Sequence, residues 1–492
     1  MTHTRRILRP RLLLIIIVLL TIIRPGDTSW VNDEPLMMEM ALRYNHTASH
    51  LYGFSLPFTP CPFGLQGTHG ERYGPLPIWI DQAFLGCTSN LILMVAVRAA
   101  IFSGLTALAV SGLAATLGLS QWFAVITMLS PWVWLFSRAL WDSTWCIPVS
   151  AVLLATYARF LVNRKSWALI VAVICSILLP LIHLMGVAMV LPVLLHMVVF
   201  HRAQIWAWRW RVGAAVLFCG YLFWPYFFYF FNHVQPSVPA RHSALWGWLF
   251  PLMGGHLLTL GVAGTMPGDG WQAFAPAILK HLVQSFQWIS RGALVVVWLG
   301  MALATRRAWK VIRRPGIADL RDHLSLIAMG VWICQTFLDG LGRVYFSPHY
   351  YSGTWIAYVY LAWIGSDWIM ARTHREIFRT ILAIYAASLV VGVAIIAAVI
   401  ARNSGTRNIF YGTSMGRQVA ATGELSRYSD KSTADMEVPQ WRLYPLAWQV
   451  LLELESPQGA AESEPRPSAQ LVVKYRDKFP GDADIVVQEI RK

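Results

Sequence analysis

The sequence from Asn90 to Leu117 reads NLILMVAVRAAIFSGLTALAVSGLAATL, an apolar run in which Arg98 is the only charged residue. A helix needs about 20 predominantly apolar residues to cross the hydrocarbon core of a bilayer. This run is longer than that, and uninterrupted apolar stretches of such length are typical of membrane spans. The run therefore predicts a transmembrane helix.

Ten further apolar blocks on either side of this run repeat the pattern. They lie at Leu12–Ile23, Trp122–Phe136, Trp145–Leu161, Trp167–Ile182, Leu184–Phe200, Val212–Phe231, Phe286–Ala304, Leu324–Leu341, Tyr351–Met370 and Ile381–Ile400. Several begin with tryptophan or tyrosine, as expected of residues at a membrane interface. The blocks predict an all-α polytopic membrane protein of about 11 transmembrane helices.

The composition and the placement of charge agree with a membrane protein. Of the 492 residues, 56% are hydrophobic and 13% are charged, whereas soluble domains carry about 25% charged residues. The formal net charge is +15. With the amino terminus inside, every basic cluster between spans falls on the internal side, where positive charge sets topology. These clusters are Arg164 and Lys165; Arg202, Arg209 and Arg211; Arg306, Arg307, Lys310, Arg313 and Arg314; and Arg372, Arg375 and Arg379. No contiguous basic face with interleaved aromatics is present, so we expect no nucleic-acid partner.

Two domains are expected. Residues 1–401 form the transmembrane domain, with external loops at residues 24–89, 137–143, 232–285 and 342–350. The stretch Leu245–Gly264 would reverse the alternation of the spans, so we expect an interfacial or re-entrant helix there. Residues 402–492 are polar and predict a small extracytoplasmic α+β domain. It has a helical stretch at Pro445–Leu454 and strands at Gln470–Tyr475 and Ile485–Ile490.

The first external loop contains paired carboxylates, Asp33 and Glu34, at the start of a helical run, Pro35–Tyr44. Paired acids at a membrane boundary suit a general base or a ligand for a divalent metal. Acids are also favoured at the amino terminus of any helix by capping and by the helix dipole. The pair alone leaves both interpretations open.

Other polar residues occur in the remaining external segments. Tyr73–Trp79 reads YGPLPIW, a rigid turn that leads into an interfacial helix. The short connection after it places Arg138 and Asp142 four residues apart, which suits either a simple ion pair or a polar site. His183 lies in the turn between two spans and is either an interfacial polar residue or a ligand.

A later external turn gathers Asp339, Arg343, His349 and Tyr350. A cationic group in this turn can hold a lipid phosphate by charge-assisted hydrogen bonds. Polarity that merely sets the topology of the chain is the alternative.

Two charged residues fall inside spans, where charge is costly and marks functional candidates. Arg98 is expected about two turns below the external surface, facing a cavity. Asp367 lies near an internal end. It is expected to reach the interface or to pair with Arg372.

The order of these elements resembles the C-type (GT-C) glycosyltransferase superfamily. The pattern consists of a short first helix, Asp33-Glu34, the loop segment GPLPIW at residues 74–79, and the motif SPW followed by SRALWD at residues 130–142. It resembles most closely the bacterial branch of protein O-mannosyltransferases and the lipid A aminoarabinose transferase. The resemblance covers about residues 7–400, and is strongest over 7–200. The tail, with YGT at residues 411–413 and YPLA at 444–447, is similar to tails in that branch.

The resemblance implies roles for individual residues. Asp33 corresponds to the catalytic base, Glu34 to its neighbour and Asp142 to the second external aspartate, while Pro75 and Leu76 correspond to the Pro-Leu element. The aminoarabinose transferases have a lysine before Pro-Pro-Leu, where this chain has Tyr73-Gly74. Arg72, Arg138 or Arg343 would then have to bind the donor phosphate. Tyr73, His183 and His349 complete the expected substrate-binding set.

The sequence therefore predicts an inverting glycosyltransferase that moves a sugar from a polyprenyl-phosphate donor to an acceptor hydroxyl. The acceptor is a glycan, a lipid or a protein, and a divalent metal on Asp33 and Glu34 is an open alternative to metal-free chemistry. A bacterial inner membrane with the site facing outward is expected. The competing hypotheses are that the protein is a transporter or lipid flippase, or that it is a non-catalytic scaffold of an envelope glycan pathway. A transporter would place ionisable residues at the membrane midplane and contain internal repeats.

Overall fold

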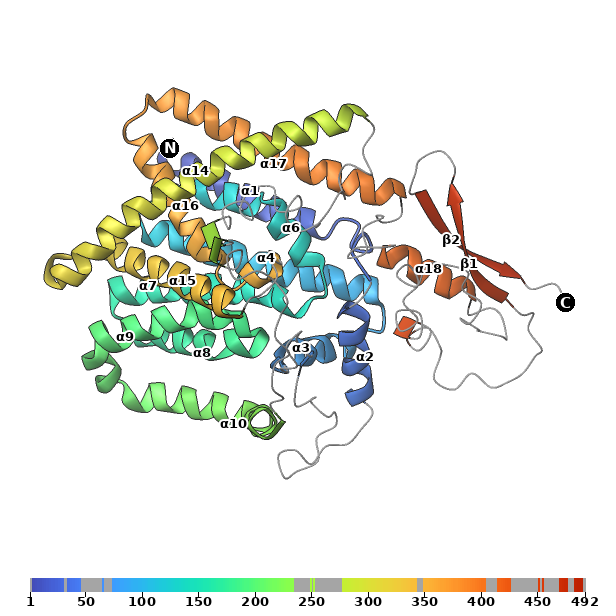
Figure 1. Ribbon diagram of the computed structural model, residues 1–492, viewed down its shortest axis with the longest axis horizontal. Helices are drawn as coiled ribbons and strands as arrows, with labels where there is room; N and C mark the ends of the chain where they lie inside the picture. Colours follow the sequence, from blue (N-terminus) through green and yellow to red (C-terminus); the bar gives the residue numbers. More distant parts are fainter. Residues whose placement is uncertain are drawn as a thin grey trace.

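The structure of the chain is a computed structural model that describes residues 2–30, 33–45, 64–65, 73–233, 248–249, 251–252, 277–342, 348–403, 414–425, 450–451, 454, 469–476 and 482–489. Its described part is a bundle of long helices with a small β-hairpin beyond one end (Figure 1). This architecture confirms the expected all-α membrane fold with a small α+β tail.

Each predicted span corresponds to helical structure. The helices are α1 (Thr2–Thr21), α4 (Leu91–Thr116), α5 (Trp122–Met128), α6 (Pro131–Arg138), α7 (Cys146–Asn163), α8 (Ser166–Ile182), α9 (Val187–Ala207), α10 (Arg209–His233), α14 (Ala277–Arg313), α15 (Leu320–Gly342), α16 (Trp355–Met370) and α17 (Arg375–Asn403). Among the described helices, five are long and apolar enough to cross a membrane. The chain is an integral membrane protein.

One predicted span is interrupted. The block Trp122–Phe136 forms two short helices, α5 and α6, which are separated at Leu129 and Ser130. Pro131 causes the break, because proline has no amide hydrogen to donate and disfavours helical geometry at the residue before it. Proline is tolerated at the first position of a new helix, and α6 begins at Pro131.

Small residues allow α14 and α16 to pack closely. A Cβ atom on Gly300 would lie 1.9 Å from the carbonyl oxygen of Leu361, and one on Gly365 would lie 2.3 Å from that of Val296. Close approach of this kind is the usual means of holding membrane helices together, since lipid leaves little hydrophobic driving force. The two glycines therefore fix α16, whose ends contribute to both ends of the bundle.

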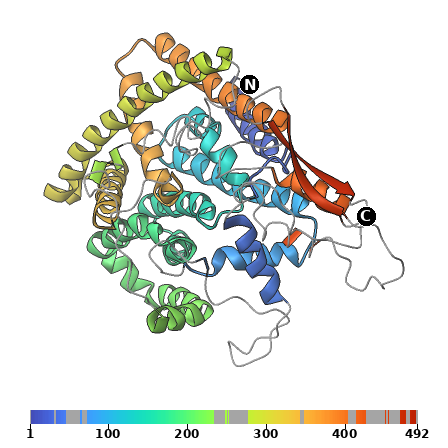
Figure 2. The same ribbon diagram turned by 45° about the vertical axis from the view of Figure 1, so that its right-hand side comes forward.

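Five short elements cluster at one end of the bundle, which we call the site end. They are α2 (Asp33–Asn45), α3 (Leu76–Leu85), η1 (Asp142–Trp145), η2 (Leu184–Gly186) and η5 (Pro348–Tyr351). Helix α3 contacts α2, α8 and η1, and η1 contacts η5. In Figure 2, α2 and α3 lie together against the helix bundle, away from α14 and α17. Segments from the first half and the second half of the chain therefore meet here.

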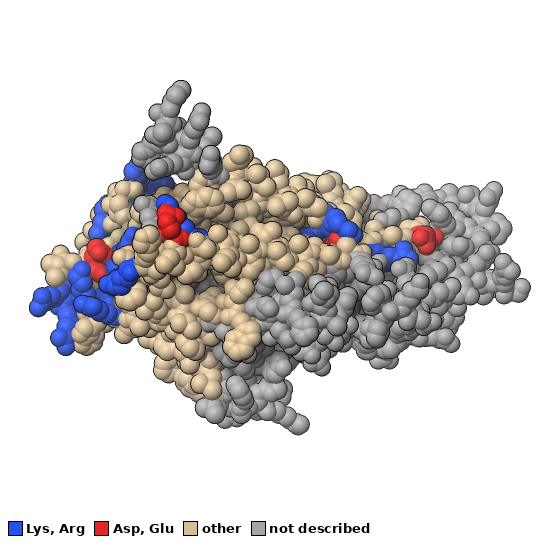
Figure 3. Space-filling view, turned by 90° about the horizontal axis from the view of Figure 1, so that it is seen from above, with Lys and Arg blue, Asp and Glu red and all other residues tan. Residues whose placement is uncertain are grey.

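The opposite end, which we call the basic end, contains the connections α7–α8, α9–α10, α14–α15 and α16–α17. On the face seen in Figure 3, most lysines and arginines gather at one end, and the middle carries little charge. Asp367 at this end binds Arg321 at 2.8 Å, so the expected pairing with Arg372 is wrong. Arg372 lies in the turn after α16, which ends at Met370, and its guanidinium stacks on Trp368 instead.

The described tail consists of α18 (Met415–Leu425) and an antiparallel hairpin of β1 (Ala469–Arg476) and β2 (Asp482–Glu489). The hairpin confirms both predicted strands. Helix α18 contacts the loop between α1 and α2: the amide of Met415 donates to the carbonyl of Thr28, and that of Gly416 to the carbonyl of Gly26, both at 2.9 Å. The tail thus lies against the site end. The helices expected at 245–264 and 445–454 fall almost wholly outside the described residues.

Candidate active site

Arg98 of α4 is the centre of the site end. Its side chain is 1% exposed. One terminal nitrogen, Nη2, donates to the carbonyl oxygen of Trp141 at 3.3 Å and to the hydroxyl of Thr144 at 3.1 Å. The guanidinium carbon lies 5.5 Å from the ring centroid of Trp145. Arg98 therefore points into the protein and ties α4 to η1.

Three carboxylates from three different elements lie within electrostatic range of this arginine. Glu34 of α2, Asp81 of α3 and Asp142 of η1 all act electrostatically on Arg98. Glu34 and Asp81 are 0% exposed and Asp142 is 7% exposed. Burying an ionised carboxylate costs several kcal/mol unless it is paired and hydrogen-bonded. A cluster with more acids than nearby arginine charge is typical of a functional site.

Asp81 was not expected from the sequence. Burial raises the pKa of its carboxyl to about 6, although the charge of Arg98 acts to lower it. Within the described part of the chain, neither carboxylate oxygen of Asp81 has a hydrogen-bond donor. A carboxyl group that titrates near neutral pH can hold or release a proton. Its lone occurrence in the apolar helix Leu76–Leu85 is the signal that could have identified it.

Asp33 and Glu34 form the first turn of α2, as predicted. The hydroxyl of Ser29 donates to Oε1 of Glu34, so the loop before α2 fixes this carboxylate. The side chain of Asp33 lies outside the described part of the structure. Its backbone places it directly before Glu34, at the site end.

Asp142 begins η1, and its Oδ1 accepts a hydrogen bond from the amide of Ser143 at 2.6 Å. This local bond holds the carboxylate at the start of the turn, next to the residues that Arg98 binds. Asp142 and Glu34, two of the predicted catalytic residues, are thus brought to the same arginine.

Arg138 has a different set of contacts from those expected of a phosphate ligand. Its Nη2 donates to the carbonyl of Ile23 at 2.7 Å and to that of Arg24, and its guanidinium lies 4.5 Å from the ring centroid of Trp134. Arg138 is 2% exposed. It binds the carbonyls that follow α1 and joins that helix to α6.

An aromatic cluster lies beside these carboxylates and brings together three residues of the predicted substrate-binding set. The ring of His183 lies 4.5 Å from Tyr73, 6.1 Å from His349 and 5.7 Å from Tyr350, measured between ring centroids. His349 in turn lies 5.8 Å from the ring of Trp141. The cluster therefore connects the first external loop, the α8–α9 turn and η5 to the segment that contains Asp142.

His183 is buried and neutral. Burial is the main cause that lowers its pKa to about 3, with a contribution from the charge of His349. Its Nδ1 accepts a hydrogen bond from the amide of Met185 at 3.3 Å. In a neutral imidazole with Nδ1 as acceptor, the proton resides on Nε2. His183 therefore offers a hydrogen-bond donor within the aromatic cluster.

The turn that carries Tyr73 is fixed by close backbone packing. A Cβ atom on Gly74 would lie 1.9 Å from the carbonyl oxygen of Leu181, so only glycine fits there. Pro75 follows as the residue that precedes the first turn of α3. Arg72 and Arg343, the other candidate phosphate ligands, lie outside the described residues.

Asp339, near the end of α15, is held by its neighbours. Its Oδ1 accepts from the side-chain Nε2 of Gln335 at 2.9 Å, and its Oδ2 accepts from the hydroxyl of Tyr351 at 2.8 Å. The bond from Tyr351 joins α15 to η5 and so supports the position of His349. Asp339 therefore holds η5, the part of the site end that comes from the second half of the chain, against α15.

The metal alternative concerned Asp33 and Glu34. Among the described residues, no group of three or more His, Cys, Asp or Glu side chains is arranged to hold a metal ion. The side chain of Asp33 is not among them. Glu34, Asp81 and Asp142 thus act electrostatically on Arg98 without themselves forming a metal-binding group.

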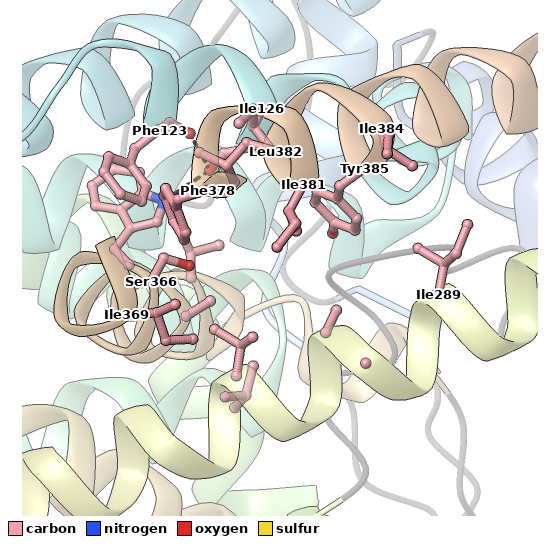
Figure 4. Close-up of a pocket in the computed structure, with 18 of the residues that line it drawn as sticks. Phe123, Ile126, Ile289, Ser366, Ile369, Phe378, Ile381, Leu382, Ile384 and Tyr385 are labelled. Atoms are coloured by element: carbon pink, nitrogen blue, oxygen red, sulfur yellow. Dashed lines mark hydrogen bonds between the residues drawn. The ribbon is translucent and has the colours of Figure 1, made fainter. Parts of the chain in front are cut away.

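An apolar cavity of about 430 Å³ runs along α16 (Figure 4). Its lining includes Trp355 at the first turn of α16 and Ile369 at the last, together with side chains of α5, α14 and α17. Fourteen residues of helix correspond to about 21 Å. Ile381 and Ile384 of α17 line the cavity and are more than half exposed, so it opens toward the lipid. Two residues of its lining, Trp363 of α16 and Thr127 of α5, are joined by a hydrogen bond of 3.0 Å from Nε1 to Oγ1.

Comparison with known proteins supports the fold. No protein-family model matches the sequence, and no curated protein matches it. The chain is structurally similar to the crystal structure of ArnT from Cupriavidus metallidurans bound to undecaprenyl phosphate, with a TM-score of 0.51 and 12% sequence identity. The match covers 98% of this chain and 97% of that one.

A similarity that extends over both chains from end to end includes the transmembrane helices and the tail alike. It confirms the architecture that the order of sequence motifs implied. The chain is an integral membrane protein with the GT-C fold of ArnT.

Proposed function

We propose that this protein is an inverting glycosyltransferase that moves a sugar from a polyprenyl-phosphate donor to an acceptor hydroxyl. The observation that carries the proposal is the convergence of Glu34, Asp81 and Asp142 around Arg98 at one end of a membrane bundle. The similar fold of ArnT, whose crystal structure contains undecaprenyl phosphate, supports a lipid-phosphate donor.

In this proposal Asp33 is the general base. An acceptor hydroxyl is a weak nucleophile, and proton removal by a positioned carboxylate contributes typically 10² to 10⁴ in rate. The oxygen of the acceptor attacks the anomeric carbon, its proton passes to Asp33, and the lipid phosphate leaves with the electron pair of the broken bond. A single displacement inverts the anomeric configuration. Glu34 and Asp142 are the supporting carboxylates.

The donor would lie with its phosphate at the site end and its tail in the apolar cavity. His183 supplies a neutral hydrogen-bond donor in the aromatic cluster, and Tyr73 and His349 add aromatic faces that suit a sugar ring. Arg72 and Arg343 are the proposed cations for the phosphate. The contacts of Arg138 with two backbone carbonyls make it a weaker choice. The cavity extends along α16, which follows η5 and His349 directly.

We further propose that the site faces the exterior of a bacterial inner membrane. Basic residues favour the cytoplasmic side, and they gather at the end opposite the site (Figure 3). This orientation would use a donor that is presented on the outer leaflet, in a cell-envelope pathway. The acceptor is a glycan, a lipid or a protein.

Asp33→Asn tests the proposal. The purified full-length protein and the variant are compared for sugar release from a panel of polyprenyl-phosphate sugars, with membrane extract as acceptor. We expect the wild type to release sugar from at least one donor and the variant to be slower by about 10² or more. Asp27→Asn is the matched control, because Asp27 lies in the same loop and binds Arg24 at 2.8 Å; it should retain activity.

Equal rates for wild type and Asp33→Asn would exclude Asp33 as the base. Lipid transport in vesicles that survives Asp33→Asn, without sugar release from any donor, would support the flippase reading instead. A biological phenotype that persists in the variant would support a scaffold.

A further inference from the structure

A second cavity, which unlike the first has charged residues in its lining, lies at the basic end, outside the site described above. Its volume is about 270 Å³, and its lining includes Arg307 of α14, Arg321 of α15, and Tyr360, Asp367, Trp368 and Arg372 of α16 and the turn after it. Three arginines and one aspartate give this lining two net positive charges. Arg372 and its neighbour Ala371 are exposed, so the cavity opens at the surface.

The partners of these charges leave the cavity short of negative charge. Arg321 binds Asp367 at 2.8 Å and donates to the carbonyl of Leu117 at 3.0 Å. Arg307 lies 3.5 Å from Asp322 and 4.0 Å from Asp319, and Lys310 approaches Asp322 more closely, at 2.6 Å.

Arg372 binds no carboxylate in the described part of the chain. It donates to the carbonyl of Trp368 at 3.4 Å, and its guanidinium carbon lies 4.0 Å above the ring of that residue. An arginine held flat on an aromatic face keeps its remaining donors available for another group.

The position of this cavity in the bundle matches a membrane interface. Arg321 and Asp339 lie near opposite ends of α15, eighteen residues and thus about 27 Å apart. That distance is close to the thickness of a bilayer core, about 30 Å. Since Asp339 belongs to the site end, the cavity lies at the level of the lipid headgroups of the other leaflet.

We propose that this cavity binds the phosphate of an anionic membrane lipid. Guanidinium groups bind phosphate through paired, charge-assisted hydrogen bonds. Basic pockets between transmembrane helices are typical binding sites for anionic headgroups. The cavity joins α14, α15 and α16, so a bound lipid would hold these three helices together at the basic end. This site is separate from the proposed donor site and does not depend on its chemistry.

Lipid binding by the full-length protein in detergent tests the proposal. The probes are short-chain phosphatidylglycerol, phosphatidylcholine with the same chains, and inorganic phosphate, and bound lipid is counted by native mass spectrometry. Wild type should prefer phosphatidylglycerol. The double variant Arg307→Gln, Arg372→Gln should bind it about tenfold more weakly, as expected when charge-assisted bonds to phosphate are lost.

Arg379→Gln is the matched control. It removes one positive charge from the same end, but Arg379 is exposed, binds Glu376 and does not line the cavity. It should bind phosphatidylglycerol as the wild type does. If the double variant fails to fold, Arg372→Gln alone serves, because it removes only the contacts with Trp368.

Two results would overturn the proposal. One is equal binding of phosphatidylglycerol and phosphatidylcholine by the wild type. The other is an equal loss in Arg379→Gln and the double variant, which would mean that the charge of the surface acts without the cavity. Competition by inorganic phosphate at concentrations near those of the lipid would confirm the phosphate site and show that the lipid chains add little to binding.

Discussion

The two ends of the helix bundle treat charge in opposite ways. At the basic end, ion pairs reach the surface: Arg379 binds Glu376 with the two side chains 56% and 68% exposed, and Arg321 binds Asp367 with both side chains about 30% exposed. At the site end, Arg98 and its carboxylates are almost fully buried.

The two ends differ in the free-energy cost of their charged groups, which is small where the groups are exposed and large where they are buried. Exposed ion pairs contribute typically 0–1 kcal/mol, so those at the basic end can serve topology and lipid contact without affecting folding. Buried ions lose their hydration and are retained only with partners that compensate for it. Charge that stays buried in spite of this cost points to chemistry at the site end.

The largest effect that would sharpen this comparison is on stability. Arg98→Met removes the buried cation whose charge acts on Glu34, Asp81 and Asp142, and leaving buried charge uncompensated costs about 3–5 kcal/mol. The free energy of unfolding, measured by denaturant titration in detergent, should fall by about that amount. The matched variant at the basic end, Arg379→Met, breaks the exposed ion pair with Glu376 and should change it by less than about 1 kcal/mol. Similar losses in the two variants would break the distinction between the ends.

The next largest effect is the change in stability when a glycine at each end is replaced by alanine, and the two changes have opposite signs. Gly74→Ala places a Cβ against the backbone of Leu181, which cannot move as a side chain can, and forced overpacking costs about 1–3 kcal/mol. In Gly112→Ala, on the half of α4 nearer the basic end, the new Cβ meets no atom within 4 Å. Alanine in a helix interior stabilises by about 0.5–1 kcal/mol relative to glycine. Thermal unfolding of the two variants should therefore shift in opposite directions, and a stable Gly74→Ala would show that the Tyr73 turn can relax.

The contrast between the ends also shows what the sequence could predict. Apolar blocks and the alternation of short strands are local patterns, so the existence of the spans and of the β-hairpin was predictable, while several boundaries differ by up to about ten residues and one predicted span is two helices. Glu34, Asp142, His183 and His349 were identified because polar residues in external loops of a membrane protein need an explanation. Their positions next to one another were not predictable from spacing alone.

Contacts between distant segments account for the errors and omissions. Asp81, from a loop helix, is one of the carboxylates that act electrostatically on Arg98, and the ring next to Tyr73 belongs to His183, more than one hundred residues away. Asp367 was expected to reach the interface or to pair with the nearby Arg372, because only sequence distance was visible, whereas α15 supplies Arg321 as its partner. Such pairings depend on which helices pack together, and the apolar pattern of a span does not encode its neighbours.

The smallest expected effect is a pH dependence that arises at the site end. His183 has a pKa of about 3 in the folded protein, and an unfolded histidine has a pKa of about 6.5. Between these values the unfolded chain binds a proton that the folded chain does not, so the free energy of unfolding falls as the pH is lowered. At pH 5.5 the loss from this residue is about 1.4 kcal/mol. Asp81 has the opposite effect on the free energy of unfolding. Its raised pKa of about 6 makes the folded state bind more protons than the unfolded state, so its contribution to stability rises as the pH is lowered.

These opposing contributions are separated by comparing variants at each pH. His183→Asn keeps an acceptor for the amide of Met185 but cannot titrate, so its unfolding free energy should fall less than that of the wild type between pH 7 and 5.5. The exposed His374 at the basic end provides the matched variant, His374→Asn, which should keep the wild-type slope. Parallel curves for wild type and His183→Asn would mean that His183 is as accessible to protons as a surface histidine. The aromatic cluster would then be open to water, and the contrast between a buried site end and a solvated basic end would no longer hold there.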